Sequence, residues 1–249
     1  MIKPMLAMTP KTYPWGDPNY WAEVKIDGIR AIIYSGISGE TSPAYTRTGN
    51  LINSHRHPKI ELPYGTILDS ELLNNKFYCF DVIRLLDEDT TKYPLSTRRE
   101  LLVTLVEGLN NPGLLVTEIL DSSREAAQAV VDAGGEGVVL KRHNSPYRAG
   151  QRHPDWLKFK AEVEMDCVVM GLTSSTIKGY SNLSLGVYKE GKLVQIGTVK
   201  HSKSITENTK LVGKVAVVRG NKIFSTGHIR HPRITRFRED KLPEDCTGQ

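Results

Sequence analysis

The residues best suited to chemistry begin with a lysine in the segment WAEVKIDGIR. Lys25, Asp27 and Arg30 lie between two predicted strands, where a side chain can project into a cleft. Gly28 permits a tight turn or a close approach of the backbone at this point. An unprotonated lysine amine in such a cleft is a nucleophile. A lysine beside an aspartate and a glycine is more often a surface turn, so this segment alone does not define a site.

Acidic and aromatic residues follow in three further segments. In TILDSELL, the two-residue period of a strand places Asp69 and Glu71 on one face, which is costly unless a metal ion, hydroxyl groups or cations meet them. In FYCFDVI, Phe80 lies opposite Asp81 and is either a core residue or a platform for a nucleobase. In GGEGVVLKR, Glu136 lies at a strand start, where it could reach a metal ion or a ribose, although helix-to-strand turns often look similar.

Two later segments are rich in basic residues. Lys158 and Lys160 of DWLKFK project from one face of a predicted strand, and they repel each other unless an anion such as phosphate neutralises them. A solvated strand edge explains this pair about equally well. The C-terminal segment RHPRITRFREDK is either a basic tail or a cluster suited to phosphate contacts, formed by Arg230, Arg233, Arg236, Arg238 and Lys241.

The elements that must position the first set of residues are strands and two helices. The capping boxes TRRE and SSRE, at residues 97–100 and 122–125, predict the helix starts, and the second helix should end at the glycines 134–135. Short segments rich in β-branched or aromatic residues predict strands. The expected fold is an α+β body with strands over 21–24, 29–34, 66–73, 77–83, 137–141 and 156–160.

The last third of the chain has a different pattern, with strands and turns only. Strands are expected over 164–171, 184–189, 192–199 and 212–218, and Glu190 with Gly191 forms a plausible hairpin turn. An all-β module of this size suits a small barrel of the oligonucleotide-binding kind, the OB-fold. We therefore expect one domain over residues 1–160 and an OB-fold domain over residues 161–249.

Composition and charge narrow the class of protein. The 249 residues are 39% hydrophobic and 24% charged, as in globular proteins, and the three scattered cysteines argue against a zinc site or a disulfide framework. No apolar run approaches a membrane span and no export signal is evident, so we expect a cytoplasmic protein.

Residues 1–160 hold 19 basic and 19 acidic residues, whereas residues 161–249 hold 14 and 9, which places the whole net charge of +5 in the last third. This distribution indicates either a phosphate-contacting domain or a solvated basic face.

Taken in order, these segments resemble the ATP-dependent DNA ligases of the covalent nucleotidyltransferase superfamily, which also contains RNA ligases and mRNA capping enzymes. The resemblance runs from about Trp21 to Lys241 and rests on KIDGIR, TRTGN, LDSE, FYCFDVI, EGVVLK, LKFK and RHPRITRFREDK in one order. It implies a nucleotidyltransferase (adenylation) domain with antiparallel sheets, followed by the OB-fold barrel. It also implies a monomer that uses ATP and Mg²⁺, with Mn²⁺ as a substitute, to seal nicked double-stranded DNA in replication, repair or recombination.

The resemblance assigns the central reaction to Lys25. This lysine would attack the α-phosphorus of ATP, expel pyrophosphate and carry AMP as a phosphoramidate. Because a protonated lysine cannot attack, the site must favour the free amine, and Lys158 and Lys160 would help through like charge and would bind the α-phosphate. The AMP would then pass to the 5′-phosphate of a nick, and the 3′-hydroxyl would expel it.

The other roles are implied in the same way. Glu71 and Glu136 would place Mg²⁺ or the ribose hydroxyls, Glu23 would lie near the adenine, and Phe80 would stack on it. Arg47 of TRTGN would contact the ribose or the 5′-phosphate of a nick. Asp27 and Arg30 would help to bind the nucleotide, and Arg30 would assist on either the nucleotide or the DNA side. Arg238, Asp240 and Lys241 match the last segment of the family, which orients the departing pyrophosphate after the barrel closes over the nucleotide.

One departure and two alternatives remain at this stage. Ser70 occupies a position where the family often has glycine. RNA ligation or guanylyl transfer to RNA ends would use the same lysine chemistry with another polymer or nucleotide. A nucleic-acid-binding module without catalysis would keep the fold alone and would form no covalent adduct.

Overall fold

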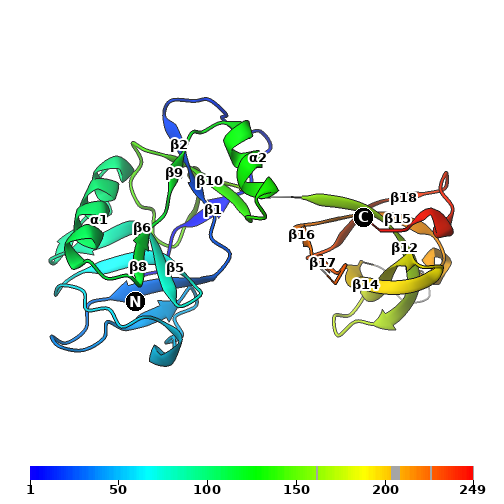
Figure 1. Ribbon diagram of the computed structural model, residues 1–249, viewed down its shortest axis with the longest axis horizontal. Helices are drawn as coiled ribbons and strands as arrows, with labels where there is room; N and C mark the ends of the chain where they lie inside the picture. The colour runs from blue at the N-terminus through cyan, green and yellow to red at the C-terminus, as the bar shows by residue number, and fades with distance from the viewer. Residues whose placement is uncertain (161, 203–207, 225, 249) are drawn as a thin grey trace. The chain divides into compact units, whose positions relative to one another are not determined.

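The computed structural model describes residues 1–160, 162–202, 208–224 and 226–248. The chain divides into two compact units, Met1–Lys160 and Ala161–Gln249 (Figure 1). No helix in these described ranges is long and apolar enough to cross a membrane.

The first sheet of the Met1–Lys160 unit carries the strand that leads to Lys25. Its strands, in spatial order, are β1 (Leu6–Met8), β11 (Arg152–Lys160), β10 (Gly137–Arg142), β2 (Tyr20–Val24) and β9 (Ile119–Leu120). All neighbours are antiparallel except β1 and β11. The helix α2 (Arg124–Asp132) packs against this sheet through Ala127, which contacts Ala22 and Val138.

The second sheet of this unit begins where the chain leaves the first. Its path is β4 (Ala44–Thr46), β3 (Ile29–Tyr34), β5 (Ile67–Leu73), β6 (Lys76–Leu85) and β7 (Glu88–Asp89), and β8 (Leu114–Val116) pairs with β6 in parallel. A short 3₁₀ turn, η1 (Ser54–Arg56), lies between β4 and β5. Because β2 belongs to one sheet and β3 to the other, residues 25–28 form the crossing between them.

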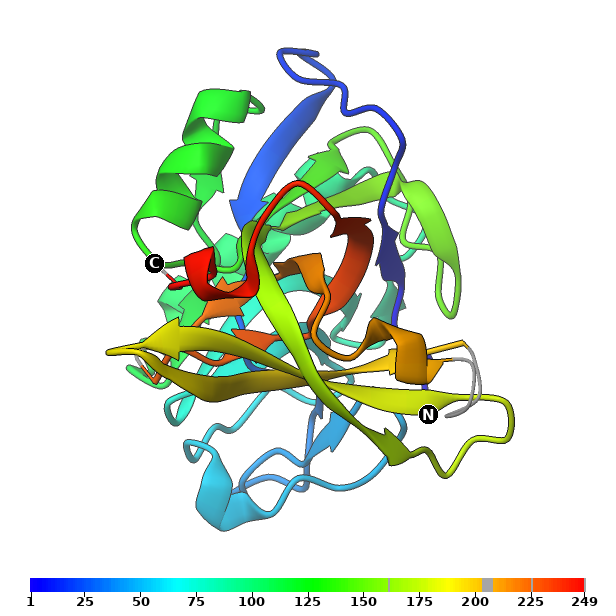
Figure 2. The ribbon, with the colours of Figure 1, turned by 90° about the vertical axis from the view of Figure 1, so that its right-hand side faces the viewer.

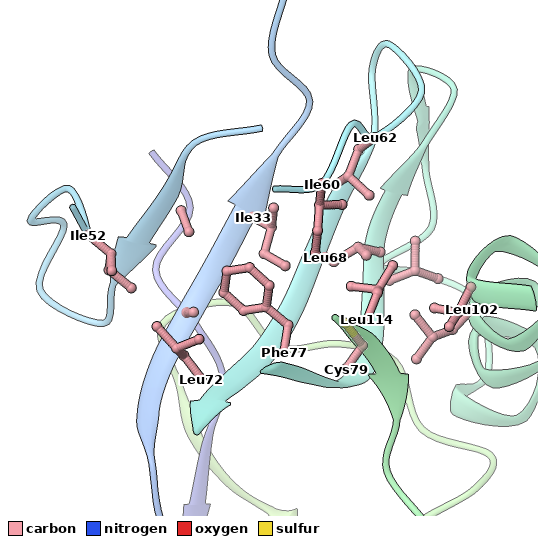
Figure 3. Packing of buried hydrophobic residues seen from close by; sticks show 14 residues of the cluster. Ile33, Ile52, Ile60, Leu62, Leu68, Leu72, Phe77, Cys79, Leu102 and Leu114 are labelled. Atoms are coloured by element: carbon pink, nitrogen blue, oxygen red, sulfur yellow. The ribbon is translucent and has the colours of Figure 1, made fainter. Parts of the chain in front are cut away.

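The largest core of the unit lies between the second sheet and α1 (Leu95–Leu109). Figure 3 shows Phe77 at the centre of this core, with Leu102 reaching in from α1. Phe77, Leu68 and Leu102 are fully buried. Each buried side chain of this kind stabilises the fold by about 1.5–3 kcal/mol, so this core fixes the sheet that presents Glu71 and Phe80.

Strands make up most of the described part of the Ala161–Gln249 unit, which also contains two short 3₁₀ turns, η2 (Thr209–Leu211) and η3 (Pro243–Asp245). Its main sheet has the order β14 (Lys192–His201), β13 (Ser181–Lys189), β12 (Val163–Ser174), β15 (Val215–Gly220) and β18 (Arg233–Arg238), all antiparallel. Figure 2 shows the long β12 in yellow-green. A separate ribbon pairs β16 (Lys222–Ile223) with β17 (Ile229–Arg230).

The sequence expectations are met for the body and need correction elsewhere. The α+β body with mainly antiparallel sheets is confirmed. The closed OB-fold barrel is not, because no ladder joins the outer strands β14 and β18 in the described residues. Of the basic segment RHPRITRFREDK, the part Arg233–Arg238 is the strand β18, which pairs with β15, so the alternative of a basic tail does not hold for it. The Glu190–Gly191 turn is confirmed, since both residues have positive φ.

The helix starts differ from the capping-box predictions. Helix α1 begins at Leu95, directly after Pro94, so the start predicted at Thr97 is wrong by two residues. Proline suits a helix start because it lacks the N–H that would be unpaired there. In α2 the capping oxygen belongs to Ser123, which accepts a hydrogen bond from the Ala126 N–H at 3.0 Å, one residue later than predicted.

A fully buried ion pair links α1 to the second sheet. The Arg98 guanidinium binds Asp81 through two hydrogen bonds of 2.7 and 2.8 Å, and it also donates to the carbonyl oxygens of Tyr93 and Ser145. Both side chains of the pair are 0% exposed. Since Asp81 follows Phe80 on β6, this pair fixes the strand beneath the aromatic ring.

We predict that Arg98→Met lowers the free energy of unfolding by about 3–5 kcal/mol, because it leaves the Asp81 carboxylate buried without its cation. Urea titration of both proteins measures the difference. Arg84→Met, which removes an exposed partner 3.9 Å from Asp87, is the matched control and should change little. The double variant Asp81→Leu with Arg98→Met should recover much of the loss; a loss as large as that of the single variant would contradict this account.

Candidate active site

A pocket of about 490 Å³ in the first unit is lined by residues from both sheets. Strands β2, β10 and β11 supply one wall, and β3, β5 and β6 supply another. The predicted site residues that line it are Glu23, Lys25, Arg30, Arg47, Glu71, Phe80, Lys158 and Lys160.

Lys25 lies just after β2, at the crossing between the sheets. Its backbone N–H donates to the Gly137 carbonyl at 2.9 Å, which ties the crossing to β10. Gly28 is required three residues later, because a Cβ at this position would lie 2.3 Å from the Leu72 carbonyl oxygen on β5. The KIDG turn is therefore packed against both sheets and is not an independent surface loop.

The Glu136 carboxylate is shared by two lysines. One oxygen accepts from Lys25 Nζ and the other from Lys160 Nζ, and the Glu136 side chain is 9% exposed. Burial, Arg152 and the neighbouring lysines lower the pKa of Lys158 on the same wall. The wall thus gathers three lysines around one carboxylate, an arrangement suited to a polyanionic ligand.

Asp69 and Glu71 have different surroundings, although they share one strand. Asp69 is fully buried and binds the Arg30 guanidinium through two contacts of 2.5 Å. The Tyr147 hydroxyl donates to Asp69 at 2.6 Å and accepts from the Met5 N–H at 2.9 Å. Asp69 therefore positions Arg30, whereas Glu71 faces the pocket.

Ser70, which lies between these two acids on β5, does not line the pocket. It is fully buried, and its hydroxyl donates to the Ala31 carbonyl on β3 at 2.7 Å. The serine that departs from the family pattern therefore has a structural partner in the sheet.

Burial dominates the electrostatics of Glu71. It raises the pKa of Glu71 to about 7, against the opposing influence of Arg30 and Lys25. Near neutral pH this carboxyl group is therefore divided between its acid and its carboxylate forms. A cation or a hydroxyl-bearing ligand beside it would favour the ionised form.

The far end of the pocket is built around Glu23 and Lys141. Lys141 Nζ donates to Glu23 at 2.8 Å and lies 4.5 Å from the Phe80 ring centroid and 4.4 Å from that of Trp156. Thr117 donates to the same Glu23 oxygen at 2.8 Å, and burial lowers the pKa of Lys141. This end offers aromatic surface next to a fixed carboxylate and ammonium, which suits a nucleobase.

Sequence reasoning misses Lys141, Trp156 and Thr117, which all line the pocket. A signal for Lys141 exists in the two-residue period of β10, which places it on the same face as Val139. Trp156 carries the same signal, because the two-residue period of β11 places it on the face of Lys158 and Lys160. Thr117 carries none, because it follows the end of β8 and only the tertiary fold brings it beside Glu23.

Four predicted residues do not line this pocket. Asp27 is exposed and is not among the lining residues, although its neighbours Ile26 and Gly28 are. Arg238 and Lys241 belong to the second unit, where both contact Asp166. Glu136 is not a lining residue but reaches the pocket through Lys25 and Lys160.

Comparison with known proteins identifies the family. Residues 68–160 match the model of the ATP dependent DNA ligase domain. The SPbeta prophage-derived DNA ligase-like protein LigB of Bacillus subtilis (strain 168) is 30% identical over 205 residues, which cover 71% of this chain and 74% of that protein. The chain belongs to the ATP-dependent DNA ligase family.

Other ligases of the family are longer or more distant. A probable DNA ligase of Nocardia farcinica is 28% identical over 77% of this chain, which spans only 43% of that protein's length. Among solved structures, a Lig E DNA ligase shares the fold with a TM-score of 0.71 and 20% identity, over 96% of this chain and 100% of the other. A mycobacterial DNA ligase D complexed with ATP and MES gives a TM-score of 0.57 at 20% identity, over 100% and 98%.

Family membership confirms the predicted class of enzyme, a DNA ligase, and does not favour RNA ligation or guanylyl transfer. The roles of the individual ligase residues stay predictions. The carboxylates predicted to hold Mg²⁺ are those of Glu71 and Glu136, and the described residues form no group of three or more metal-binding side chains. Two carboxylates fit Mg²⁺, which usually binds one or two of them together with substrate phosphates and water.

We predict that Glu71→Gln stabilises the ligase more as pH rises. A carboxyl group whose pKa is raised on folding costs stability once the same group ionises in the unfolded chain, so the cost begins near the ordinary carboxyl pKa of about 4.3, grows between pH 5 and pH 7 and levels off above it. The gain over the wild type should reach about 1–3 kcal/mol at pH 8. Denaturant unfolding at pH 5, 7 and 8 tests this, with the exposed Glu118→Gln as control; a pH-independent gain would show that Glu71 is not strained by burial.

Proposed function

We propose that this DNA ligase seals nicks between a 5′-phosphate and a 3′-hydroxyl in duplex DNA, with Lys25 as the nucleophile that carries AMP. The observation that carries the proposal is the position of Lys25 in a pocket with an aromatic end and a lysine-rich wall. The aromatic end would bind the base of a nucleotide, and the lysine-rich wall would bind its phosphates.

In the first step, Lys25 Nζ forms a bond to the α-phosphorus of ATP, and the bond to the β-phosphate oxygen breaks, so that pyrophosphate leaves. The amine must lose a proton before it attacks. Because Glu136 accepts the hydrogen bond from Lys25 Nζ, it is the group placed to take that proton. Lys158 and Lys160 then offset the negative charge that develops on the phosphate.

The adenosine portion would lie at the far end of the pocket. Phe80 supplies a ring for stacking, and Glu23 supplies an acceptor for the adenine amino group. Arg47 and Glu71 also line the pocket and would face the ribose and the phosphates. The Arg30 guanidinium lies 4.7 Å from the Phe80 ring centroid and would therefore lie beside the base. Mg²⁺ held by Glu71 and Glu136 would offset charge on the phosphates when bound, and Glu136 can join such a site only if it releases one of its two lysines.

Two further steps complete the reaction. The 5′-phosphate of the nick attacks the phosphorus of the lysine-bound AMP, the N–P bond breaks, and the DNA carries AMP through a pyrophosphate link. The 3′-hydroxyl then attacks the 5′-phosphorus, loses its proton and expels AMP. Both steps need nearby cations, and the lysine-rich wall supplies them.

The second unit supplies the remaining roles in this proposal. We assign it as an OB-fold-type module, on the basis of its five antiparallel strands around the long β12 and its excess of basic residues. Arg238 and Lys241 would contact the departing pyrophosphate, as the family resemblance implies. The other basic residues would contact DNA phosphates.

A labelled nicked duplex incubated with ATP and Mg²⁺ tests the function directly. The proposal predicts sealing of the DNA nick, weaker or no sealing of an all-RNA nick, and protein labelling from α-labelled ATP. Labelling from GTP alone would contradict the ligase reaction and would point to guanylyl transfer instead.

We predict that Lys25→Arg abolishes labelling by α-labelled ATP and sealing of an ordinary nick. Arginine keeps the positive charge beside Glu136, but its guanidinium does not deprotonate in proteins and is no nucleophile. Gel detection of the labelled protein measures the loss. Lys76→Arg, at the exposed end of β6, is the control and should be labelled like the wild type. Labelling of Lys25→Arg at the wild-type rate would move the nucleophile elsewhere.

A further inference from the structure

One carboxylate oxygen in the second unit binds two cations at once. Asp166 Oδ2 accepts from Arg238 Nη1 at 2.8 Å and from Lys241 Nζ at 3.0 Å. The three side chains are 19%, 25% and 25% exposed, so this cluster is half-buried. Asp240 accepts from the remaining two nitrogens of Arg238, Nε and Nη2. Both cations therefore have fixed positions on the surface of the unit.

The sheet brings these residues together from distant parts of the chain. Asp166 lies on β12 and Arg238 ends β18, and β15 pairs with both strands. Lys241 follows three residues after Arg238, past the end of the strand. Asp166 thus connects the start of the unit to its last strand, and it is separated from Lys241 by 75 positions in sequence.

Two cations that meet at one oxygen repel each other, and the Asp166 carboxylate offsets this repulsion because it binds both of them. Asp240 binds Arg238 alone, so without Asp166 nothing would hold Arg238 and Lys241 to each other, and the flexible lysine side chain would move apart from the arginine. Held together, they present two positive groups to a single anion without further ordering. Such preorganisation is what stabilises charge that develops in a transition state.

We propose that Asp166 is a positioning residue for the first step of ligation, in which it holds Arg238 and Lys241 as one cation pair ready for the departing pyrophosphate. This inference rests on the proposed function, which gives Arg238 and Lys241 that contact. Asp166 itself does not touch the nucleotide. Its effect is confined to the step that releases pyrophosphate, because the second and third steps release none.

Neighbouring acids on the same strand provide a contrast. Glu164 lies two residues before Asp166 on β12. It binds Arg219 at 2.7 Å, but both side chains of that pair are 47% exposed. Glu162, just before the strand, binds Arg233 and is also exposed. Exposed pairs of this kind contribute little. Glu164→Gln therefore removes one negative charge and one ion pair from the same strand without touching the Asp166 cluster.

The test separates charging from sealing in the full chain. Single-turnover labelling by α-labelled ATP, at saturating ATP, measures the first step, and closure of a nick that already carries AMP measures the last. We expect Asp166→Asn to slow charging by about tenfold or more and to leave closure of the adenylated nick unchanged. Glu164→Gln should match the wild type in both assays. Asp166→Glu, which keeps the carboxylate, should recover part of the charging rate.

Each other outcome overturns the inference in a distinct way. Unchanged charging in Asp166→Asn shows that the cation pair needs no anchor. Faster charging shows that Asp166 competes with pyrophosphate. Equal losses in both assays, with a lowered midpoint of thermal unfolding, show a purely structural role. Lys241→Ala is measured in parallel. Unchanged charging in that variant contradicts the proposed role of Lys241. If charging is lost in Lys241→Ala but not in Asp166→Asn, only the proposed role of Asp166 is contradicted.

Discussion

Charge pairing at the meeting of two sheets is the constraint on which the first unit depends. Several lysine and arginine side chains of this unit are buried or half-buried, and an unpaired buried charge would cost several kcal/mol. Five of these cations are met by a carboxylate from another strand or turn. The pairs are Lys141 with Glu23, Arg30 with Asp69, Arg98 with Asp81, and Lys25 and Lys160 with Glu136.

These pairs divide between support and chemistry according to their burial. The Arg98 and Asp81 side chains are wholly enclosed and only hold α1 against β6. The pair at Lys25 is partly open, since the Lys25 side chain is 24% exposed, and a polyanionic nucleotide can replace its carboxylate partner. The proposed reaction needs both kinds, because a lysine that attacks ATP would have to be fixed in place and yet released when substrate phosphates bind.

The sequence predicts most of the pocket because strand alternation and short ordered segments determine which residues share a face. Lys158 and Lys160 on β11, and Phe80 on β6, are placed in this way. Asp27 is beyond its reach, because the position of this residue depends on the exact path of a turn. Strand alternation places Lys141 on the same face as Val139, but its position beside Glu23 and Trp156 depends on pairing with distant strands. Likewise, Pro94 rather than a capping box begins α1, and barrel closure requires contacts between outer strands that no local pattern encodes.

The central claim is that Lys25 forms the bond to AMP, and the most direct measurement is to locate that bond. The ligase is incubated with ATP and Mg²⁺, digested under conditions that preserve the phosphoramidate, and its peptides are analysed by tandem mass spectrometry. The account predicts an added adenylate on Lys25, in the peptide that contains WAEVKIDGIR. An adduct on Lys158 or Lys160 instead, with Lys25 unmodified, would contradict it.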